Sequence, residues 1–296
     1  MNLHLKKFPS LLKETFVEWN KKDPFRQSAV IAYYSIFSLP GLLVLIVTIL
    51  GYFFTRDAIT HNIINQISST FGPNVSKEME SLLTNAGRGK GTILGSIIGI
   101  GTLIVGATGV FIALQKTLNE IWKIDSEKQK HNGILLFFKN RLFSFGLILS
   151  IAFLLLISLV LSTVLSAVGD WFNSGTSDVM LRIFNIINFL FSLVVISFLF
   201  GLIFKILPDA KIKWNCVWMG SLVTGILFTI GKTALGFYFG KATPESAYGA
   251  GGSIVLLLLW VSYSSMILFF GAEFTYTYSK HFFPQDEENK EAIIKY

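Results

Sequence analysis

Six long stretches without a charged residue constrain this chain more than any other feature of its sequence. The stretches that lack Asp, Glu, Lys and Arg are 27–55, 91–115, 142–169, 183–204, 214–231 and 246–272. Each is close to or longer than the roughly 20 apolar residues that a helix needs to cross the hydrocarbon of a bilayer. Membrane-spanning β-strands would alternate polar with apolar side chains, and runs such as 147–161 do not alternate. We therefore predict an all-α polytopic membrane protein with six transmembrane helices.

The composition agrees with this prediction. Only 15% of the 296 residues are charged and the mean hydropathy is +0.59, whereas about a quarter of the residues of a soluble domain are charged. The polar residues are therefore too few to form the shell of a large soluble core. We expect a cytoplasmic amphipathic segment over 1–26, a transmembrane domain over 27–280 and an acidic cytoplasmic tail over 281–296. The six spans are expected at about 28–54, 91–114, 142–168, 184–206, 215–239 and 252–277.

The basic residues between the spans indicate the orientation, because Lys and Arg are retained on the cytoplasmic side of a membrane. When successive segments are assigned to alternate sides, 18 of the 25 Lys and Arg lie on the side of the two termini and 6 on the other. The remaining one, Lys232, lies inside a span. We therefore predict that both termini are cytoplasmic. Because topology alone explains this distribution, the basic pI of about 9.3 does not indicate a nucleic acid partner.

The N-terminal segment carries an amphipathic pattern. Leu12, Phe16 and Trp19 recur at helical spacing after Pro9, and Pro24 ends the pattern. We expect a short helix, which either lies at the membrane interface or packs on other cytoplasmic loops, since amphipathicity does not name the apolar partner.

The first predicted outer loop, 56–90, is the longest connection and carries two further amphipathic patterns. Isoleucines recur at helical spacing over 59–67, Gly72 and Pro73 break the pattern, and apolar residues resume over 75–83. We expect two short helices on or over the outer surface.

Glycines at regular spacing indicate close helix contacts. Gly91, Gly95 and Gly99 recur at four-residue intervals, which lets another helix approach closely in lipid. This ridge serves either packing within the bundle or a face between copies in a homo-oligomer.

Pro40 interrupts the first span, where it removes a backbone hydrogen bond. The expected consequence is a kink or, more sharply, a broken helix that lines a cavity. Lys232 would be held beside such a cavity, because an ionisable group at membrane depth is costly elsewhere. The residues predicted to line a cavity or substrate path are Tyr33, Tyr34, Ser38, Pro40, Lys232 and Tyr248.

A second predicted group of polar residues lies toward the cytoplasmic side. Gln115 and Asn119 share one helix face, Asp209 follows the fourth span, and Glu273 lies near the inner end of the sixth. These residues form either an inner gate or a set of interfacial caps and ion pairs.

The sequence contains no motif of a known catalytic or metal site. The four histidines are far apart in the chain, so no HExxH pair exists, and the single cysteine, Cys216, excludes a disulfide framework and a Cys-based zinc site. GxSxG and Walker motifs are also absent. We expect no enzymatic activity, no catalytic residues, no metal and no cofactor.

Four stretches together resemble the YihY/BrkB family (UPF0761) of bacterial inner-membrane proteins: 32–40 (AYYSIFSLP), 114–122 (LQKTLNEIW), 207–212 (LPDAKI) and 271–275 (GAEFT). The resemblance covers nearly the whole chain, and it implies a fold and a location more than an activity. The family is associated with virulence or serum resistance and with envelope lipid handling. It once carried a ribonuclease BN label, but nucleases of that class need a histidine-rich metal motif that this chain lacks.

Two function classes follow from the sequence. The first is an integral inner-membrane protein that binds or moves a lipid or another amphiphilic envelope component, with membrane lipids as its partners. The second is a structural or regulatory membrane protein that transports nothing, whose glycines and kink serve packing. A ribonuclease is a remote third reading, because no residue cluster supports it.

Overall fold

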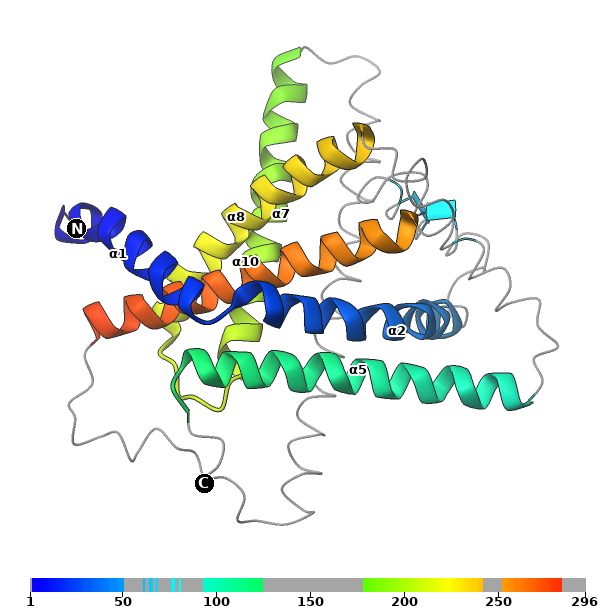
Figure 1. The fold of residues 1–296 in the computed structure, drawn as a ribbon. Coiled ribbons are helices and arrows are strands. Elements are labelled where there is room, and N and C mark those ends of the chain that lie inside the picture. Colours follow the sequence, from blue (N-terminus) through cyan, green and yellow to red (C-terminus); the bar gives the residue numbers. More distant parts are fainter. Residues whose placement is uncertain are drawn as a thin grey trace. The chain divides into compact units, whose positions relative to one another are not determined.

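The computed structural model of the chain describes residues 2–50, 93–124, 178–241 and 252–283, together with isolated positions between 61 and 80. All regular secondary structure in these ranges is helical, so the all-α prediction is confirmed for the described part of the chain. The helices, labelled in Figure 1, are α1 (Asn2–Lys21), α2 (Pro24–Leu50), α5 (Ile93–Ile121), α7 (Asp178–Ile206), α8 (Trp214–Lys241) and α10 (Gly252–Phe282).

Three of these helices are long and apolar enough to cross a membrane. Their apolar windows are Phe189–Ile206, Trp214–Tyr238 and Ile254–Phe282. Five of the six expected spans coincide with α2, α5, α7, α8 and α10. The remaining span at 142–168 and most of the loop 56–90 lie outside the described residues, as does the tail beyond Phe283. The six-span topology and the orientation of the termini therefore stay predictions.

The N-terminal helix is longer than its amphipathic pattern predicts. It begins at Asn2 and contains Pro9 in its interior, whereas the pattern placed the start after Pro9. A proline inside a helix removes one backbone hydrogen bond. Pro9 lies on the exposed side of α1, where water can satisfy the carbonyl that loses its donor.

The first predicted span is not broken at Pro40. α2 is one continuous helix from Pro24 to Leu50, which corrects the broken-helix alternative. A proline removes only its own donor, and in lipid every other backbone group still has to be satisfied within the helix. The last turns of α2, toward Leu50, run in a different direction from its first half in Figure 1, as the milder expectation of a kink implies.

The chain divides into two compact units. Unit 1 comprises Met1–Trp19, Gln115–Thr229 and Leu268–Tyr296, and unit 2 comprises Asn20–Leu114 and Ile230–Ile267. Within unit 1, α10 provides the core, because nearly every side chain from Leu268 to Thr277 is buried. A helix that is buried on all its sides belongs at the centre of its packing unit.

α8 and α10 approach each other in unit 1 through reciprocal pairs of glycine and threonine. A Cβ at Gly220 would lie only 2.8 Å from the Thr275 Cβ, and one at Gly271 only 2.9 Å from the Thr224 Cβ. Each threonine donates its hydroxyl to the glycine carbonyl four residues earlier in its own helix, Thr224 at 2.6 Å and Thr275 at 2.7 Å. Small residues of this kind let two backbones approach closely.

A second contact of α8, with α7, repeats the arrangement with serine. Gly201 of α7 lies against Ser221 of α8, and Gly225 of α8 lies against Ser197 of α7. Both serines are buried. α8 is therefore fixed in unit 1 by two faces of small residues, with α10 on one and α7 on the other.

Unit 2 uses glycine differently. Gly109 of α5 lies against the ring of Tyr34 of α2, and Gly231 of α8 lies against the hydroxyl end of Tyr263 of α10. A hydrogen bond of 3.0 Å also joins the hydroxyl groups of Ser28 and Ser262 between α2 and α10. Gly109 and Gly231 thus accommodate aromatic rings, whereas Gly106 lies against the backbone of α2 at Tyr34 and Ser38.

Candidate functional site

A polar cluster in unit 1 joins the end of α5 to the loop between α7 and α8. The side-chain N–H of Asn119 donates to Asp209 Oδ2 at 2.8 Å, and the side-chain oxygen of Asn119 accepts the backbone N–H of Asp209 at 2.9 Å. Gln115 donates to the same carboxylate, at 3.2 Å to Oδ2 and 3.4 Å to Oδ1. The structure therefore brings together three of the four residues expected on the cytoplasmic side.

The local structure of α5 explains how Asn119 is held. The helix ends with Lys123 in the left-handed conformation at φ 55°. The Lys123 N–H bonds to the Glu120 carbonyl at 3.1 Å, and the Ile124 N–H bonds to the Asn119 carbonyl at 2.9 Å. This is the pair of bonds of a Schellman motif, which satisfies the last carbonyls of a helix. Asn119 is thus fixed by its backbone and buried, with its side chain free to meet the loop.

The loop that carries Asp209 is held from both sides. Leu207, Pro208 and Ile212 are buried, and the ammonium of Lys205 donates a hydrogen bond to the carbonyl of Ile212. The ion pairs among the described residues include none between Lys205 and Asp209, so this alternative from the sequence is not observed. Asp209 instead receives neutral amide donors.

The chemistry of this cluster is suited to holding two segments of the chain together. Hydrogen bonds from amide N–H groups to a carboxylate are charge-assisted and therefore stronger than bonds between neutral groups. The amides offer no proton to exchange, and no group of three or more His, Cys, Asp and Glu suited to a metal ion exists among the described residues. The cluster therefore pins the loop from Leu207 to Lys213 to the end of α5.

Glu273, the fourth residue of the predicted group, lies in the core of unit 1. Its side chain is 1% exposed on α10, between the buried Ala272 and Phe274. It engages in interactions of its own, but no described hydrogen bond joins it to Asn119 or Asp209. A carboxylate buried this deeply needs hydrogen-bond or ion-pair partners, because burial of an unpaired charge costs folding free energy.

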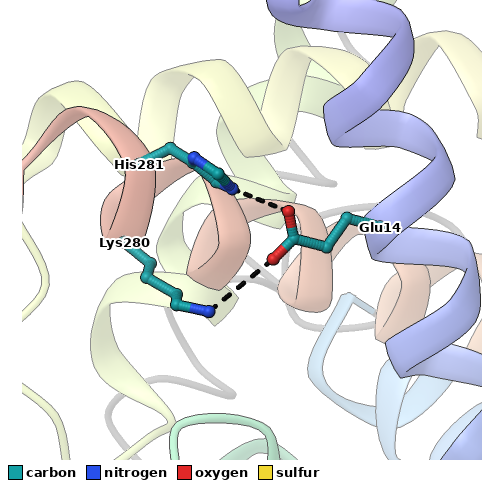
Figure 2. Close-up of polar contacts among 3 residues, drawn as sticks. All are labelled: Glu14, Lys280 and His281. Atoms are coloured by element: carbon teal, nitrogen blue, oxygen red, sulfur yellow. Dashed lines mark hydrogen bonds and ion pairs between the residues drawn. The ribbon is translucent and has the colours of Figure 1, made fainter.

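α1 is attached to α10 by contacts that the sequence pattern did not indicate. Glu14 accepts from His281 at 2.7 Å and forms an ion pair with Lys280 at 3.7 Å (Figure 2). Aromatic contacts reinforce the attachment, between Phe8 and Phe274 at 5.7 Å and between Trp19 and Phe270 at 5.9 Å. Of the two alternatives for the N-terminal segment, packing against its own protein is thus observed on one side of α1. The opposite side leaves Phe16 and Val17 exposed.

The predicted path residues of α2 lie in two environments. Tyr33 is 58% exposed, beside Phe37 on an outward-facing side of the helix. Tyr34 and Ser38 instead lie against Gly106 and Gly109 of α5, where they fill a helix contact. Pro40 is part of the continuous α2, and Tyr248 lies outside the described residues.

Lys232 is exposed on α8, which corrects the expectation of a buried cation. The physical reason is that α8 is apolar all round, so its sequence does not indicate which side faces the bundle. Lys232 nevertheless lies within the apolar window Trp214–Tyr238.

The predicted glycine ridge is only partly described. Gly91 lies outside the described residues, and Gly95 and Gly99 lie on α5. A close contact on this helix is formed further along the chain, at Gly106 and Gly109. The sequence could have indicated the contact at Gly106 and Gly109, because these two residues continue the glycine series of the same helix.

The comparisons with known proteins agree with this helical membrane architecture. The family model described as "Virulence factor BrkB" matches residues 15–293. A "UPF0761 membrane protein" of Saccharophagus degradans is 27% identical over 274 residues, which cover 91% of this chain and 59% of that protein. A "UPF0761 membrane protein" of Pseudoalteromonas atlantica is 26% identical over 280 residues, which cover 93% of this chain and 88% of that protein.

The relatives differ in length. The chain spans about 60% of the proteins from Saccharophagus degradans and Teredinibacter turnerae that it matches. No solved structure matches the chain significantly. The names of these relatives describe membrane proteins and state no enzymatic activity. Since the family model matches most of its length, and its helices are apolar enough to cross a bilayer, the chain is a membrane protein of the BrkB/UPF0761 family.

Proposed function

We propose that this protein binds a lipid or another anionic amphiphile of the bacterial envelope and moves it within or out of the cytoplasmic membrane. In this proposal the chain crosses the inner membrane several times and has both termini in the cytoplasm. Its role is one of binding and transport, without enzymatic chemistry or a bound cofactor, and membrane lipids are its partners.

The observation that carries the proposal is the position of Lys232. Lys232 is exposed, and the large exposed side chains near it on α8 are apolar or aromatic, namely Ile230, Phe237 and Tyr238. Lys232 lies nine residues before Lys241, the end of α8, which corresponds to about 14 Å along the helix axis. A cation at such depth is costly in pure hydrocarbon and is stabilised by an anionic partner.

The residues around Lys232 indicate the chemistry of the ligand. A headgroup phosphate or carboxylate would accept hydrogen bonds from the Lys232 ammonium, while acyl chains would contact the apolar side chains on the same helix. Thr233 directly follows Lys232, and Tyr33 of α2 is another exposed polar residue of unit 2. In this proposal both side chains contact a moving headgroup. Without a nucleotide-binding motif in the sequence, the driving force would be an ion gradient, a partner or the lipid gradient itself.

Native mass spectrometry of the full chain in a gentle detergent tests the proposal. Lys232→Met should retain fewer anionic lipids than the natural chain, and Lys232→Arg should retain as many, because Arg keeps the charge. Lys116→Met, which removes an exposed lysine from α5, is the matched control. Equal retention of anionic lipid in all four proteins would overturn the proposal.

One observation favours the second function class, a structural or regulatory membrane protein. Tyr34 and Ser38, expected to line a path, are used for packing against Gly106 and Gly109. If this class is correct, proteoliposomes that contain the natural chain will move a fluorescent phosphatidylglycerol between leaflets no faster than protein-free vesicles do.

A further inference from the structure

We infer that the start of α8 carries a second lipid site, specific for an anionic phospholipid of the adjacent leaflet. The site is a surface of unit 1, called here the Trp surface. Its residues are Lys205, Trp214, Trp218, Leu222 and Ile226. It does not depend on Lys232 or on the transport proposed above.

The apolar part of the Trp surface is a stripe along one side of α8. Its four members recur every fourth residue, and each is between 43% and 47% exposed. From Trp214 to Ile226 the helix rises about 18 Å, comparable with the roughly 15 Å that one leaflet contributes to the hydrocarbon core. The stripe therefore has the length over which an acyl chain can lie against it.

The aromatic end of the stripe is built for an interface between hydrocarbon and headgroups. The ring centroids of Trp214 and Trp218 lie 6.3 Å apart with the rings tilted by 34°, and Phe198 of α7 lies 6.1 Å from Trp218 at the same tilt. Tryptophan is enriched at this depth because one end of its ring is apolar and its N–H is polar.

The charge at the same end specifies the ligand. The ammonium of Lys205 lies 5.6 Å from the Trp214 ring centroid and donates to the Ile212 carbonyl. None of the ion pairs between described residues involves Lys205. Lys213 is exposed at the end of the loop, with its ammonium 5.2 Å from the Phe283 ring centroid, whereas Asp209, the loop's carboxylate, accepts from the amides of α5. The excess of positive charge above an apolar stripe matches an anionic headgroup above its acyl chains.

The test uses the fluorescence of the tryptophans in the full chain, reconstituted into nanodiscs. Phospholipids brominated on the acyl chains quench tryptophans that they contact, so brominated phosphatidylglycerol is compared with brominated phosphatidylcholine at equal content. We expect stronger quenching by phosphatidylglycerol. The excess should disappear in the double variant Trp214→Phe, Trp218→Phe, which assigns it to these rings among the six tryptophans of the chain.

The lysine variants test the headgroup. Lys205→Met should weaken the preference for phosphatidylglycerol about fivefold, the effect of one lysine charge near an anionic headgroup. Lys205→Arg should keep it, as should Lys116→Met and Lys232→Met. A folding defect of Lys205→Met does not spoil the test, because the preference of the natural chain should itself fall as salt is raised.

Three results would overturn the inference. The first is equal quenching by both lipids. The second is a preference that survives Lys205→Met and high salt. The third is protection of Trp214 and Trp218 from both lipids, which would mean that another part of this chain or a second copy covers the stripe. A loss of lipid in Lys232→Met alone concerns the transport proposal and leaves this site intact.

Discussion

The two units solve the same problem, close approach of helices in lipid, with different partners for their glycines. In unit 1, Gly220 and Gly271 lie against threonines of the facing helix, and both helices contribute equally. In unit 2, Gly109 and Gly231 lie against tyrosine rings. A threonine is branched at Cβ and cannot withdraw without moving its backbone, whereas the end of a tyrosine can rotate away. Contacts of the first kind should therefore tolerate less change than contacts of the second.

The largest effect is expected where glycine meets threonine. Gly271→Ala places a methyl group against the Thr224 side chain, so α8 and α10 must separate. Overpacking of a tight contact costs about 1–3 kcal/mol, and we expect the upper end of this range because the carbonyl of Gly271 also accepts the Thr275 hydroxyl. The midpoint of thermal unfolding in detergent measures the change.

Gly236→Ala is the control, since a Cβ at that position on α8 meets nothing within 4 Å. It should be neutral or stabilise the helix by up to about 1 kcal/mol. If Gly271→Ala is as harmless as Gly236→Ala, the reciprocal contact does not hold unit 1 together.

The polar cluster should rank second. Asn119→Ala removes the amide that meets both the carboxylate and the N–H of Asp209. Hydrogen bonds to a charged group contribute about 1.5–3 kcal/mol, so a loss of about 2 kcal/mol is expected. A double-mutant cycle with Asp209→Ala should give a coupling energy of at least about 1 kcal/mol. Additive losses would show that the two side chains act independently.

The sequence indicated the cluster but not the glycine contacts, and the difference has a physical cause. Gln115 and Asn119 stand out because amides at helical spacing are rare in an apolar helix, and Asp209 follows the next span. Glycines are common, with 25 in the chain, and spacing alone does not say which face of a helix meets which partner. Gly91, Gly95 and Gly99 therefore drew attention, while the pairs made by Gly220 and Gly271 needed the positions of Thr224 and Thr275.

The exposure of Lys232 could not be predicted from the sequence, for a related reason. A helix that alternates polar and apolar faces shows which face is buried, but α8 is apolar all round. The extent of the helices was easier to predict, because a span in lipid is limited by charge and length. The hydrogen bond from Lys205, at the end of α7, to the Ile212 carbonyl depends on the geometry of the following loop, which has no periodic sequence signal.

The contact between glycine and tyrosine in unit 2 should give a smaller loss than Gly271→Ala. Gly231→Ala places a methyl group against the hydroxyl end of Tyr263. Because that end of the ring can move, we expect a loss of about 1 kcal/mol, at the low end for overpacking. Tyr263→Leu in the same chain should restore part of the stability by shortening the side chain. A loss equal to that of Gly271→Ala would remove the distinction between the two units.

The smallest effect is expected at the exposed contact between α1 and α10 within unit 1. Glu14→Gln removes the charge that faces Lys280 and His281 while keeping an oxygen that can accept a hydrogen bond (Figure 2). The side chains of these residues are between 37% and 64% exposed, and exposed ion pairs contribute at most about 1 kcal/mol. We expect a loss of roughly 0.5 kcal/mol, which 0.5 M salt should abolish in the natural chain. The aromatic contacts of Phe8 and Trp19 should still hold the helix, so limited proteolysis before residue 20 should be unchanged. Rapid cleavage of α1 in Glu14→Gln would show instead that the charges, and not the rings, attach this helix to α10.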